Sequence, residues 1–408
     1  MTNWKKQFGM FCGSQAFTIM GASIVQFSVT WWITMHTQSA TMLAFAFIAA
    51  FVPNMILGPF AGVWIDRMNR RNVMIIADMV LALSSVALGA AFLLAEAPPL
   101  WFIFAMLMLR GLANTFHGPA MLAAIPQLVP TEMLTKAGGW GNMIRSAASM
   151  VGPVAGAALM GVFPVASIML VDIVSGMLAI VCLLFIKIPK VAPQNQEKVR
   201  VMADMKVGLG ALRENKPLLS LFPVLIAMSL ITMPLWSFFP LLVRVHYAGT
   251  AWHNSAAEVL FSAGLVLSSV VLGVLGGMKR RFLMVALALV VMAIATLASG
   301  LLPMSLFWVF LICCFFMGGS GSFIQVPIMA YAQETLAPEH MGKVLSLFVT
   351  AQSWVVPVGM LIGGPLVERI GVDRWFVVSG VALLVVGVAC YVVMRKHEDV
   401  AEKSAENP

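Results

Sequence analysis

The chain has 408 residues, of which 61% are hydrophobic and only 10% are charged, and its formal net charge is +8. Soluble globular proteins carry about 25% charged residues, so this composition excludes a soluble enzyme and indicates that lipid surrounds most of the surface. The basic residues are scattered over loops without interleaved aromatic residues, which excludes a nucleic-acid partner.

Twelve apolar segments are long enough to cross a bilayer, which takes about 20 residues each. These segments must be helical, because lipid offers no hydrogen-bond partner to an open backbone. The expected spans are residues 8–34, 41–64, 73–95, 99–121, 140–163, 165–187, 218–243, 257–278, 282–302, 304–326, 345–367 and 375–394.

The placement of basic residues sets the expected orientation. If both termini face the cytoplasm, the segments on that side hold 20 of the 25 Lys and Arg residues, whereas the outer segments hold only Arg244, Arg369 and Arg374. Such an excess of basic residues on the cytoplasmic side is the usual orientation signal of membrane proteins. We therefore expect a multi-pass protein of the plasma membrane with both termini inside, in contact with anionic lipid.

Landmarks in the first half of the chain recur in the second half. Pro119 and Pro130 recur as Pro327 and Pro338, in each case 208 residues later. Two bundles built to one plan are typical of secondary transporters, whose substrate site lies near the membrane midplane between the halves. We expect an all-α integral membrane protein with twelve transmembrane helices in two pseudo-symmetric six-helix halves.

The loop between the second and third spans carries a motif, Gly62-Val-Trp-Ile-Asp66-Arg67-Met-Asn69-Arg70-Arg71. It resembles the G-x-L-a-D-R-x-G-R-[KR] signature of the major facilitator superfamily. Asn69 stands where that family usually has Gly, and it is expected to preserve the tight turn because Asn tolerates positive φ. The resemblance implies a gating role, whereas the alternative is that the basic residues only anchor the loop at the membrane surface. The candidate gating residues are Gly62, Asp66, Arg67, Arg70 and Arg71.

Charged residues inside the spans are concentrated in the first half of the chain. Leu109-Arg110-Gly111 resembles the span-4 arginine motif of the superfamily. In the drug exporters of that superfamily this arginine is associated with proton coupling. Arg110 lies near the midplane, where a bare arginine is costly, so it should face a cavity or a partner. Its alternative role is a structural ion pair within the first half. A satisfied polar residue near the membrane interface is expected at His117.

Two carboxylates lie well inside the spans of the first half, Asp78 in the third span and Asp172 in the sixth. The spans of the second half are nearly free of charged residues, so we expect the first half to carry any transported proton. For Asp78 the alternatives are proton coupling and a structural pair with Arg145. The proton-coupling candidates are therefore Arg110, Asp78 and Asp172.

The fifth span contains Ala148-Ser-Met-Val-Gly152-Pro153-Val-Ala-Gly156-Ala157, which resembles the antiporter motif G-x-x-x-G-P-x-x-G-G. Alanine replaces the first and last glycines of that motif. Small residues at this spacing let helices pack closely, and a proline here can bend the helix. The motif residues Gly152, Pro153 and Gly156 favour an exporter over an importer.

The expected organisation has four parts, because a polar stretch separates the two halves. From Val199 to Leu212 apolar residues recur at helical spacing, which predicts an amphipathic helix on the cytoplasmic membrane surface. No G-x-x-x-x-G-K-[ST] loop occurs, so an ion gradient is the expected energy source rather than ATP. The parts are an N-terminal bundle (1–187), a linker (188–217), a C-terminal bundle (218–394) and a cytoplasmic tail (395–408).

A substrate cavity is expected from polar and aromatic residues of three spans. Gln15 and Gln26 share one face of the first span, since eleven residues make nearly three helical turns. The seventh span adds Trp236 and Phe238, and the tenth adds Gln325. With 31 Met and 26 Phe in the chain, a large, mostly apolar substrate, neutral or cationic, fits better than a sugar, whose hydroxyls need more buried polar partners.

Along its full length the chain resembles the bacterial drug–proton antiporters of the major facilitator superfamily, and especially their macrolide-efflux branch. Shared features include Trp4-Lys5-Lys6-x-Phe8, Asp78 in the third span and Ile125-Pro126-x-Leu-Val-Pro130. The resemblance implies a monomeric, non-enzymatic exporter of macrolide-like drugs in the bacterial plasma membrane, with alternating access, proton antiport and no cofactor. The alternatives are a siderophore or other metabolite exporter, a lipid or lysolipid translocator, and a transporter-like receptor without turnover.

Overall fold

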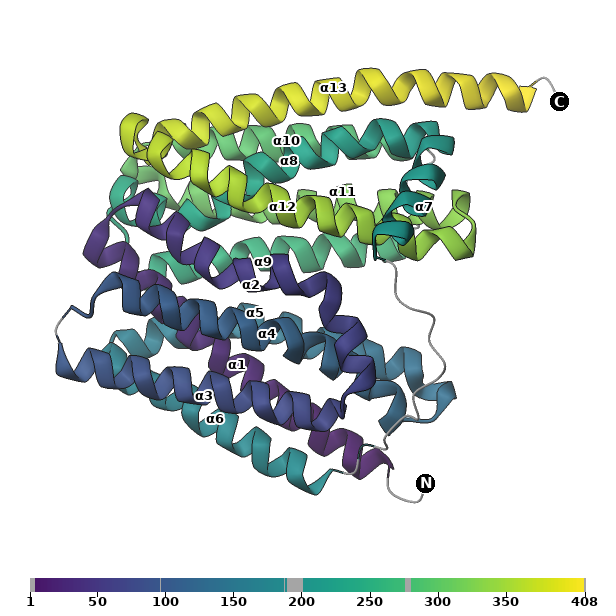
Figure 1. Cartoon of the computed structure of the whole chain (residues 1–408). Helices are drawn as coiled ribbons and strands as arrows, with labels where there is room; N and C mark the ends of the chain where they lie inside the picture. Colours follow the sequence, from purple (N-terminus) through teal and green to yellow (C-terminus); the bar gives the residue numbers. More distant parts are fainter. Residues whose placement is uncertain (1–3, 96, 187, 189–200, 276–279, 407–408) are drawn as a thin grey trace. The chain divides into compact units, whose positions relative to one another are not determined.

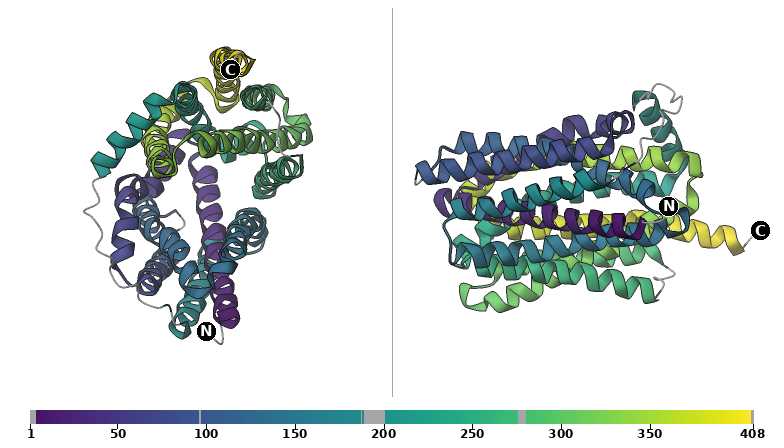
Figure 2. Two further views of the ribbon diagram at one scale, coloured as in Figure 1. Left: turned by 90° about the vertical axis from the view of Figure 1, so that its right-hand side faces the viewer. Right: turned by 90° about the horizontal axis from the view of Figure 1, so that it is seen from below.

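The computed structural model describes residues 4–95, 97–186, 188, 201–275 and 280–406, and every secondary-structure element in these ranges is a helix (Figure 1). Twelve of the described helices are long and apolar enough to cross a membrane, which confirms the twelve predicted spans. Several helices extend beyond the apolar stretches, since polar residues continue the helix past the lipid-facing part. The C-terminal helix, for example, continues to Glu406 (yellow in Figures 1 and 2).

The chain divides into two compact units, Met1–Thr37 with Phe45–Val199 and Gln38–Ala44 with Arg200–Pro408. The N-terminal unit contains α1 (Trp4–Thr37), most of α2 (Ala40–Arg67), α3 (Arg70–Leu94), α4 (Leu100–Leu128), the 3-10 turn η1 (Thr131–Met133), α5 (Leu134–Met160) and α6 (Val165–Phe185). The C-terminal unit contains α7 (Val201–Glu214), α8 (Lys216–Leu241), the π-helical turn η2 (Leu242–His246), α9 (Ala251–Leu275), α10 (Arg281–Leu301), the 3-10 turn η3 (Met304–Leu306), α11 (Phe307–Thr335), α12 (Pro338–Ile370) and α13 (Val372–Glu406).

In the N-terminal unit, α1 packs on α5 and α6, and α3 packs on α4 and α6. Near the end of the unit where α2 meets α3, an apolar cluster joins four helices through Phe11, Met74, Met121 and Leu183, all of which are buried. Burial of such large side chains between helices fixes how each helix is rotated about its axis. We refer to this end as the α2–α3 end.

Two glycines of the span-5 motif bring α5 against α1. A Cβ atom on Gly156 would lie 2.8 Å from Cδ1 of Phe27, and one on Gly152 would collide with the Ser23 side chain. The motif therefore acts as a close helix contact, as small residues at four-residue spacing do in membrane bundles.

The same contact recurs in the C-terminal unit, between α12 and α8. A Cβ atom on Gly359 would lie 2.9 Å from the Leu230 carbonyl oxygen, and one on Gly363 would lie 3.2 Å from Cβ of Pro234. Each of these four residues comes 207 positions after its counterpart in the first unit. The internal repeat is thus visible in individual contacts as well as in the proline landmarks.

The amphipathic helix of the linker, α7, packs against α12 and α8 of its own unit. Gly208 makes the closest approach, because a Cβ atom there would lie 2.7 Å from the Lys343 carbonyl oxygen. Leu212 is buried as the apolar periodicity predicts, whereas Leu209 is exposed. The described face of α7 that packs on protein is therefore formed by Gly208 and Leu212.

The turn between α2 and α3 differs from expectation. Asn69 has φ −73° and ψ 108°, so the predicted positive φ at this position is wrong. Its side-chain oxygen accepts a hydrogen bond from the Arg71 backbone N–H at 3.1 Å and caps the N-terminus of α3. Asn is a favoured N-cap residue, so it replaces the family's glycine by starting the next helix rather than by copying a glycine conformation.

Candidate functional site

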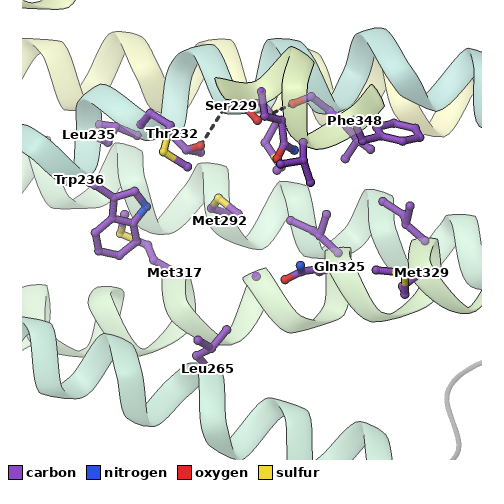
Figure 3. Close-up of a pocket in the computed structure, with 18 of the residues that line it drawn as sticks. Ser229, Thr232, Leu235, Trp236, Leu265, Met292, Met317, Gln325, Met329 and Phe348 are labelled. Atoms are coloured by element: carbon purple, nitrogen blue, oxygen red, sulfur yellow. Dashed lines mark hydrogen bonds between the residues drawn. The ribbon is translucent and has the colours of Figure 1, made fainter. Parts of the chain in front are cut away.

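A cavity of about 460 Å³ lies within the C-terminal unit, lined by residues of α8, α9, α10, α11 and α12 (Figure 3). Its volume falls in the range of small-molecule sites. Among the described residues that line it, none is Asp, Glu, Lys, Arg or His. Five of them are methionines, namely Met228, Met233, Met292, Met317 and Met329.

Aromatic rings form part of the cavity wall. The Trp236 ring lies edge-on to Phe261, with ring centroids 3.8 Å apart, and 5.7 Å from the ring of Phe239. Phe348 of α12 also lines the cavity. Thioethers can adapt to different ligand shapes, whereas a packed indole is a fixed apolar surface, so this wall combines adaptable and rigid contacts.

The polar groups of the cavity divide into satisfied hydroxyls and unengaged amides. Ser229, Thr232 and Thr296 each donate to the carbonyl four residues earlier in their own helix, at 2.8–2.9 Å. The amides of Gln325 and Gln352 form no hydrogen bond with another described residue. These two amides are therefore the groups that can donate to or accept from a bound molecule.

The structure brings together two of the five predicted cavity residues, Trp236 and Gln325 (Figure 3). Phe238 lies elsewhere, fully buried with its ring centroid 6.3 Å from that of Trp375. Residues two apart on a helix point about 200° from each other, so Trp236 and Phe238 cannot share a face.

The two glutamines of α1 belong to the N-terminal unit and do not line this cavity. Gln15 is fully buried, whereas Gln26 is exposed and donates to the Thr30 hydroxyl at 3.3 Å. Sequence reasoning missed Gln352, whose signal is an amide in a span without charged residues.

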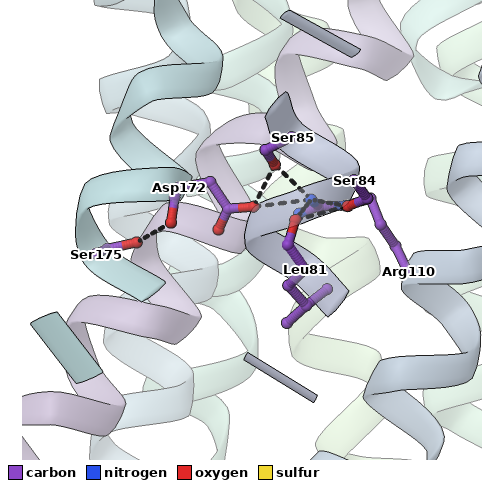
Figure 4. A network of polar contacts seen from close by, with 6 residues as sticks. All are labelled: Leu81, Ser84, Ser85, Arg110, Asp172 and Ser175. Carbon is purple, nitrogen blue, oxygen red and sulfur yellow. Dashed lines mark hydrogen bonds and ion pairs between the residues drawn. The ribbon is translucent and has the colours of Figure 1, made fainter. Parts of the chain in front are cut away.

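An ionic network occupies the interior of the N-terminal unit (Figure 4). Nη1 of Arg110 on α4 donates to Oδ2 of Asp172 on α6 at 2.7 Å, and to the hydroxyls of Ser85 and Ser84 on α3 at 2.8 and 3.1 Å. The same nitrogen lies 3.4 Å from the Leu81 carbonyl oxygen, and Ser85 also donates to Asp172 at 2.6 Å. Arg110 and Asp172 are buried, so each neutralises a charge that would otherwise be costly.

Asp78, the third coupling candidate, faces a histidine. Nε2 of His117 on α4 lies 3.1 Å from Oδ1 of Asp78 on α3. Both residues are buried, so the polar partner of His117 is a carboxylate of the neighbouring helix. The alternative partner, Arg145, has a side chain outside the described set.

The loop motif lies at the α2–α3 end. Asp66 Oδ1 pairs with Arg70 Nη2 at 3.4 Å, and Arg70 Nη1 donates to the Ala123 carbonyl of α4 at 3.0 Å. Arg71 Nη2 donates to the Leu184 carbonyl of α6 at 2.8 Å. The two arginines therefore tie the start of α3 to the ends of α4 and α6, whereas the remaining motif residues, Gly62 and Arg67, are exposed.

Comparison with known proteins gives a consistent result. A family model described as Major Facilitator Superfamily matches residues 11–359 and 246–407. Macrolide efflux protein A of Streptococcus pyogenes is 32% identical over 389 residues, which cover 95% of this chain and 96% of that protein. Macrolide efflux protein A of Enterococcus faecalis is 32% identical over 323 residues, covering 79% and 99%. A bacterial homologue of the iron transporter ferroportin, in an inward-facing state, has a similar fold, with a TM-score of 0.72, 16% identity and coverage of 95% and 98%.

Proposed function

Since the chain belongs to the major facilitator superfamily, we propose that it exports large, mostly apolar drugs of the macrolide class by proton antiport through alternating access. Its relatives support a drug-efflux transporter that spans the bacterial plasma membrane many times. We further propose that it works as a monomer in contact with lipid, with both termini and the α2–α3 loop in the cytoplasm, as the basic residues of the loops indicate.

The observation that carries this proposal is the uncharged cavity of the C-terminal unit. Its methionines and the fixed ring of Trp236 suit an apolar ligand of variable outline, while Gln325 and Gln352 can bond to hydroxyl or carbonyl oxygens. An amine on the ligand would meet the face of an aromatic ring rather than a carboxylate. A sugar would leave most of its hydroxyls without partners here.

The internal repeat supports different roles for the two halves, ion coupling in the first and substrate binding in the second. Gly111 lies against the Ala50 carbonyl, and its counterpart Gly318 lies against the Phe261 carbonyl, so positions near these glycines in α4 and α11 correspond at 207 residues, one fewer than the prolines further along the same helices. At this offset Arg110 corresponds to Met317, which lines the cavity. Asp172 likewise corresponds to the uncharged Ser379.

Ser85, the α3 member of the Arg110 network, also has a counterpart in the second half. Gly89 of α3 packs on Ala166 and Met169 of α6, and Gly300 of α10 packs on Asp373 and Phe376 of α13. The two contacted residues of α13 each come 207 positions after those of α6, so the two contacts are equivalent. Positions in α3 and α10 therefore correspond at 211 residues. Ser85 therefore corresponds to Thr296, another cavity residue. Where the first half holds charges, the second holds an apolar cavity, which fits ion coupling in one half and substrate binding in the other.

Transport into inverted membrane vesicles tests the proposal. Vesicles containing the protein should accumulate a radiolabelled macrolide when their interior is acidic, and accumulation should stop when an ionophore collapses ΔpH. Addition of macrolide should also release protons from acidified vesicles. A fluorescent lysolipid and an iron-free siderophore, assayed in parallel, represent the alternative substrates. Accumulation of either of these in place of the macrolide, or uptake that is indifferent to ΔpH, would contradict the proposal.

A further inference from the structure

We propose that the transported proton binds at the buried pair formed by Asp78 and His117, and that the Arg110–Asp172 pair keeps its charges throughout the cycle. This inference rests on the proposed proton antiport and assigns the proton to one of its candidate groups. Both pairs lie within the N-terminal unit, so their distances do not depend on how the two units are arranged.

The contacts of Asp78 set it apart from the other buried carboxylate. It is fully buried, and neither carboxylate oxygen has a well-aligned hydrogen bond with a described residue. Among the described side chains, the His117 imidazole is the one ionisable group within ion-pair distance, at 3.1 Å. The charge of Asp78 is thus balanced only by a ring that itself gains and loses a proton.

Apolar layers enclose the pair along the helix axes. Met74 and Met121, each four residues from the pair on α3 and α4, belong to the cluster at the α2–α3 end. On the other side, Leu81 and Ala113 form a second apolar cluster. Arg110 lies seven residues from His117 on α4, and its partners Ser84 and Ser85 lie six and seven residues from Asp78 on α3, about 9–10 Å by helix rise. The pair is therefore a separate polar layer.

The neighbouring helix α1 adds unengaged polar atoms at this level. Gln15 follows Phe11 by four residues, as Asp78 follows Met74, and Phe11 and Met74 share the apolar cluster. The Gln15 amide oxygen and the Thr18 hydroxyl are buried without a hydrogen-bond partner among the described residues. Buried polar atoms are normally satisfied, so this layer can hold water or pass a proton.

The other charged groups around the pair are already engaged or distant. Arg110 on α4 and Asp172 on α6 neutralise each other, and α1 carries no charged residue between Phe11 and Thr34. At the α2–α3 end, Arg70 and Arg71 bond to backbone carbonyls. On α5, Lys136 is exposed and the side chain of Arg145 lies outside the described set.

Proton chemistry separates the two buried pairs. A guanidinium does not release its proton in a protein, and protonation of Asp172 would leave Arg110 buried without a counter-charge. By contrast, imidazole changes its charge in the physiological pH range. When Asp78 and a neutral His117 take up one proton, the pair has no net charge, and when they release it, one negative charge remains.

This difference in charge couples the proton to conformation. The loaded, neutral pair can remain enclosed between its apolar layers, whereas the unloaded pair needs water around its negative charge. A conformation that admits water to the pair therefore favours release, and one that excludes water favours the loaded form. No bond other than that to the proton changes in this step, and the proton exchanges with water.

The decisive experiment measures proton release when a macrolide binds to the purified transporter in weakly buffered detergent across the pH range in which imidazole titrates. The wild type should release protons, whereas Asp78→Asn and His117→Asn should bind the macrolide and release none. In vesicles, both variants should keep macrolide exchange at zero gradient and lose accumulation driven by ΔpH. His246→Asn is the matched control, since its Nε2 lies 2.8 Å from the Leu302 carbonyl oxygen rather than near a carboxylate, and it should behave as the wild type.

The outcomes distinguish this inference from the function on which it rests. If the wild type neither releases protons nor responds to ΔpH, the antiport proposal fails. If the wild type does both and the two variants still release protons and accumulate macrolide, the assignment to Asp78 and His117 is wrong. Should a single variant fail to fold, the double variant Asp78→Asn/His117→Asn is measured instead, because it leaves no unpaired buried ion. Proton release by that double variant would equally overturn the assignment.

Discussion

At the residue scale, the buried charged residues described in the N-terminal unit have partners that differ in kind. Arg110 and Asp172 form an ion pair between a guanidinium and a carboxylate, supported by Ser84 and Ser85. Asp78 instead faces an imidazole. A guanidinium–carboxylate pair balances a positive and a negative charge between its helices, whereas the balance of a carboxylate–imidazole pair depends on the proton of the ring.

The first prediction concerns the Arg110–Asp172 pair. Asp172→Asn removes the anion and leaves the Arg110 guanidinium buried, which should destabilise the protein by about 3–5 kcal/mol. The double variant Arg110→Met/Asp172→Ser introduces the residues that the C-terminal half has at the corresponding positions, and it should recover most of that stability, because apolar replacement of a buried pair is often neutral. Thermal unfolding in detergent gives both values. An Asp172→Asn variant as stable as the wild type would contradict the described network.

The second prediction concerns the cavity wall. Trp236→Ala should weaken macrolide binding about tenfold, because it removes a large, fixed aromatic surface from the site. Trp308→Ala is the matched control, since Trp308 lies on α11 with 74% of its surface exposed and does not line the cavity. Equilibrium binding of a labelled macrolide to both variants is the measurement. Equal losses in the two variants would remove the cavity from consideration as the substrate site.

At the element scale, helices in both units meet through glycines at four-residue spacing. The α1–α5 contact uses Gly152 and Gly156, and the α8–α12 contact uses Gly359 and Gly363. Between apolar helices in lipid the driving force for association is close packing, so the absence of a Cβ atom at these positions contributes directly to stability. The antiporter motif thus has a structural role, the close packing of α5 on α1, which does not depend on its role in transport.

The third prediction tests this contact. Gly156→Leu should destabilise the N-terminal unit by about 1–3 kcal/mol, because the new side chain would overlap the Phe27 ring. Gly139→Leu on the same helix is the control, since a Cβ atom there meets nothing within 4 Å. The measurement is the unfolding temperature of each variant in detergent. If Gly139→Leu destabilised as much as Gly156→Leu, helix propensity or solubility would explain the loss and the packing argument would fall.

The fourth prediction concerns the connection between α2 and α3. Asp66 is 43% exposed in its side chain and pairs with Arg70, which also holds the end of α4. An exposed pair contributes about 0.2–1 kcal/mol, so Asp66→Asn should change the balance between conformations up to about fivefold. Transport should slow by that factor while equilibrium binding of macrolide changes less. Large, equal losses of binding affinity in the inward-facing and outward-facing states would exclude a gating role.

At the scale of the whole molecule, one helical plan is used twice for different purposes. Positions that hold Arg110 and Ser85 in the first unit hold Met317 and Thr296 in the second, where both line the cavity. The backbone contacts are kept while the side chains change, because glycine contacts fix the helices independently of the residues that face the interior. Among the described residues, the first unit thus holds a buried ion pair where the second holds residues of an apolar cavity.

The number of membrane spans, the twofold repeat and the family could all be predicted from the sequence, because each depends on local composition or on motifs that are continuous in the chain. The partner of each buried charge could not, since it depends on which helices are neighbours and how each is rotated about its axis. Thus Asp172 meets Arg110, and Asp78 meets a histidine that the sequence placed at the membrane interface. Rotation also separates Trp236 from Phe238 on α8. Periodicity along one chain segment carries no information on the contacts of its neighbours, so only packing of the folded helices decided which polar residues meet.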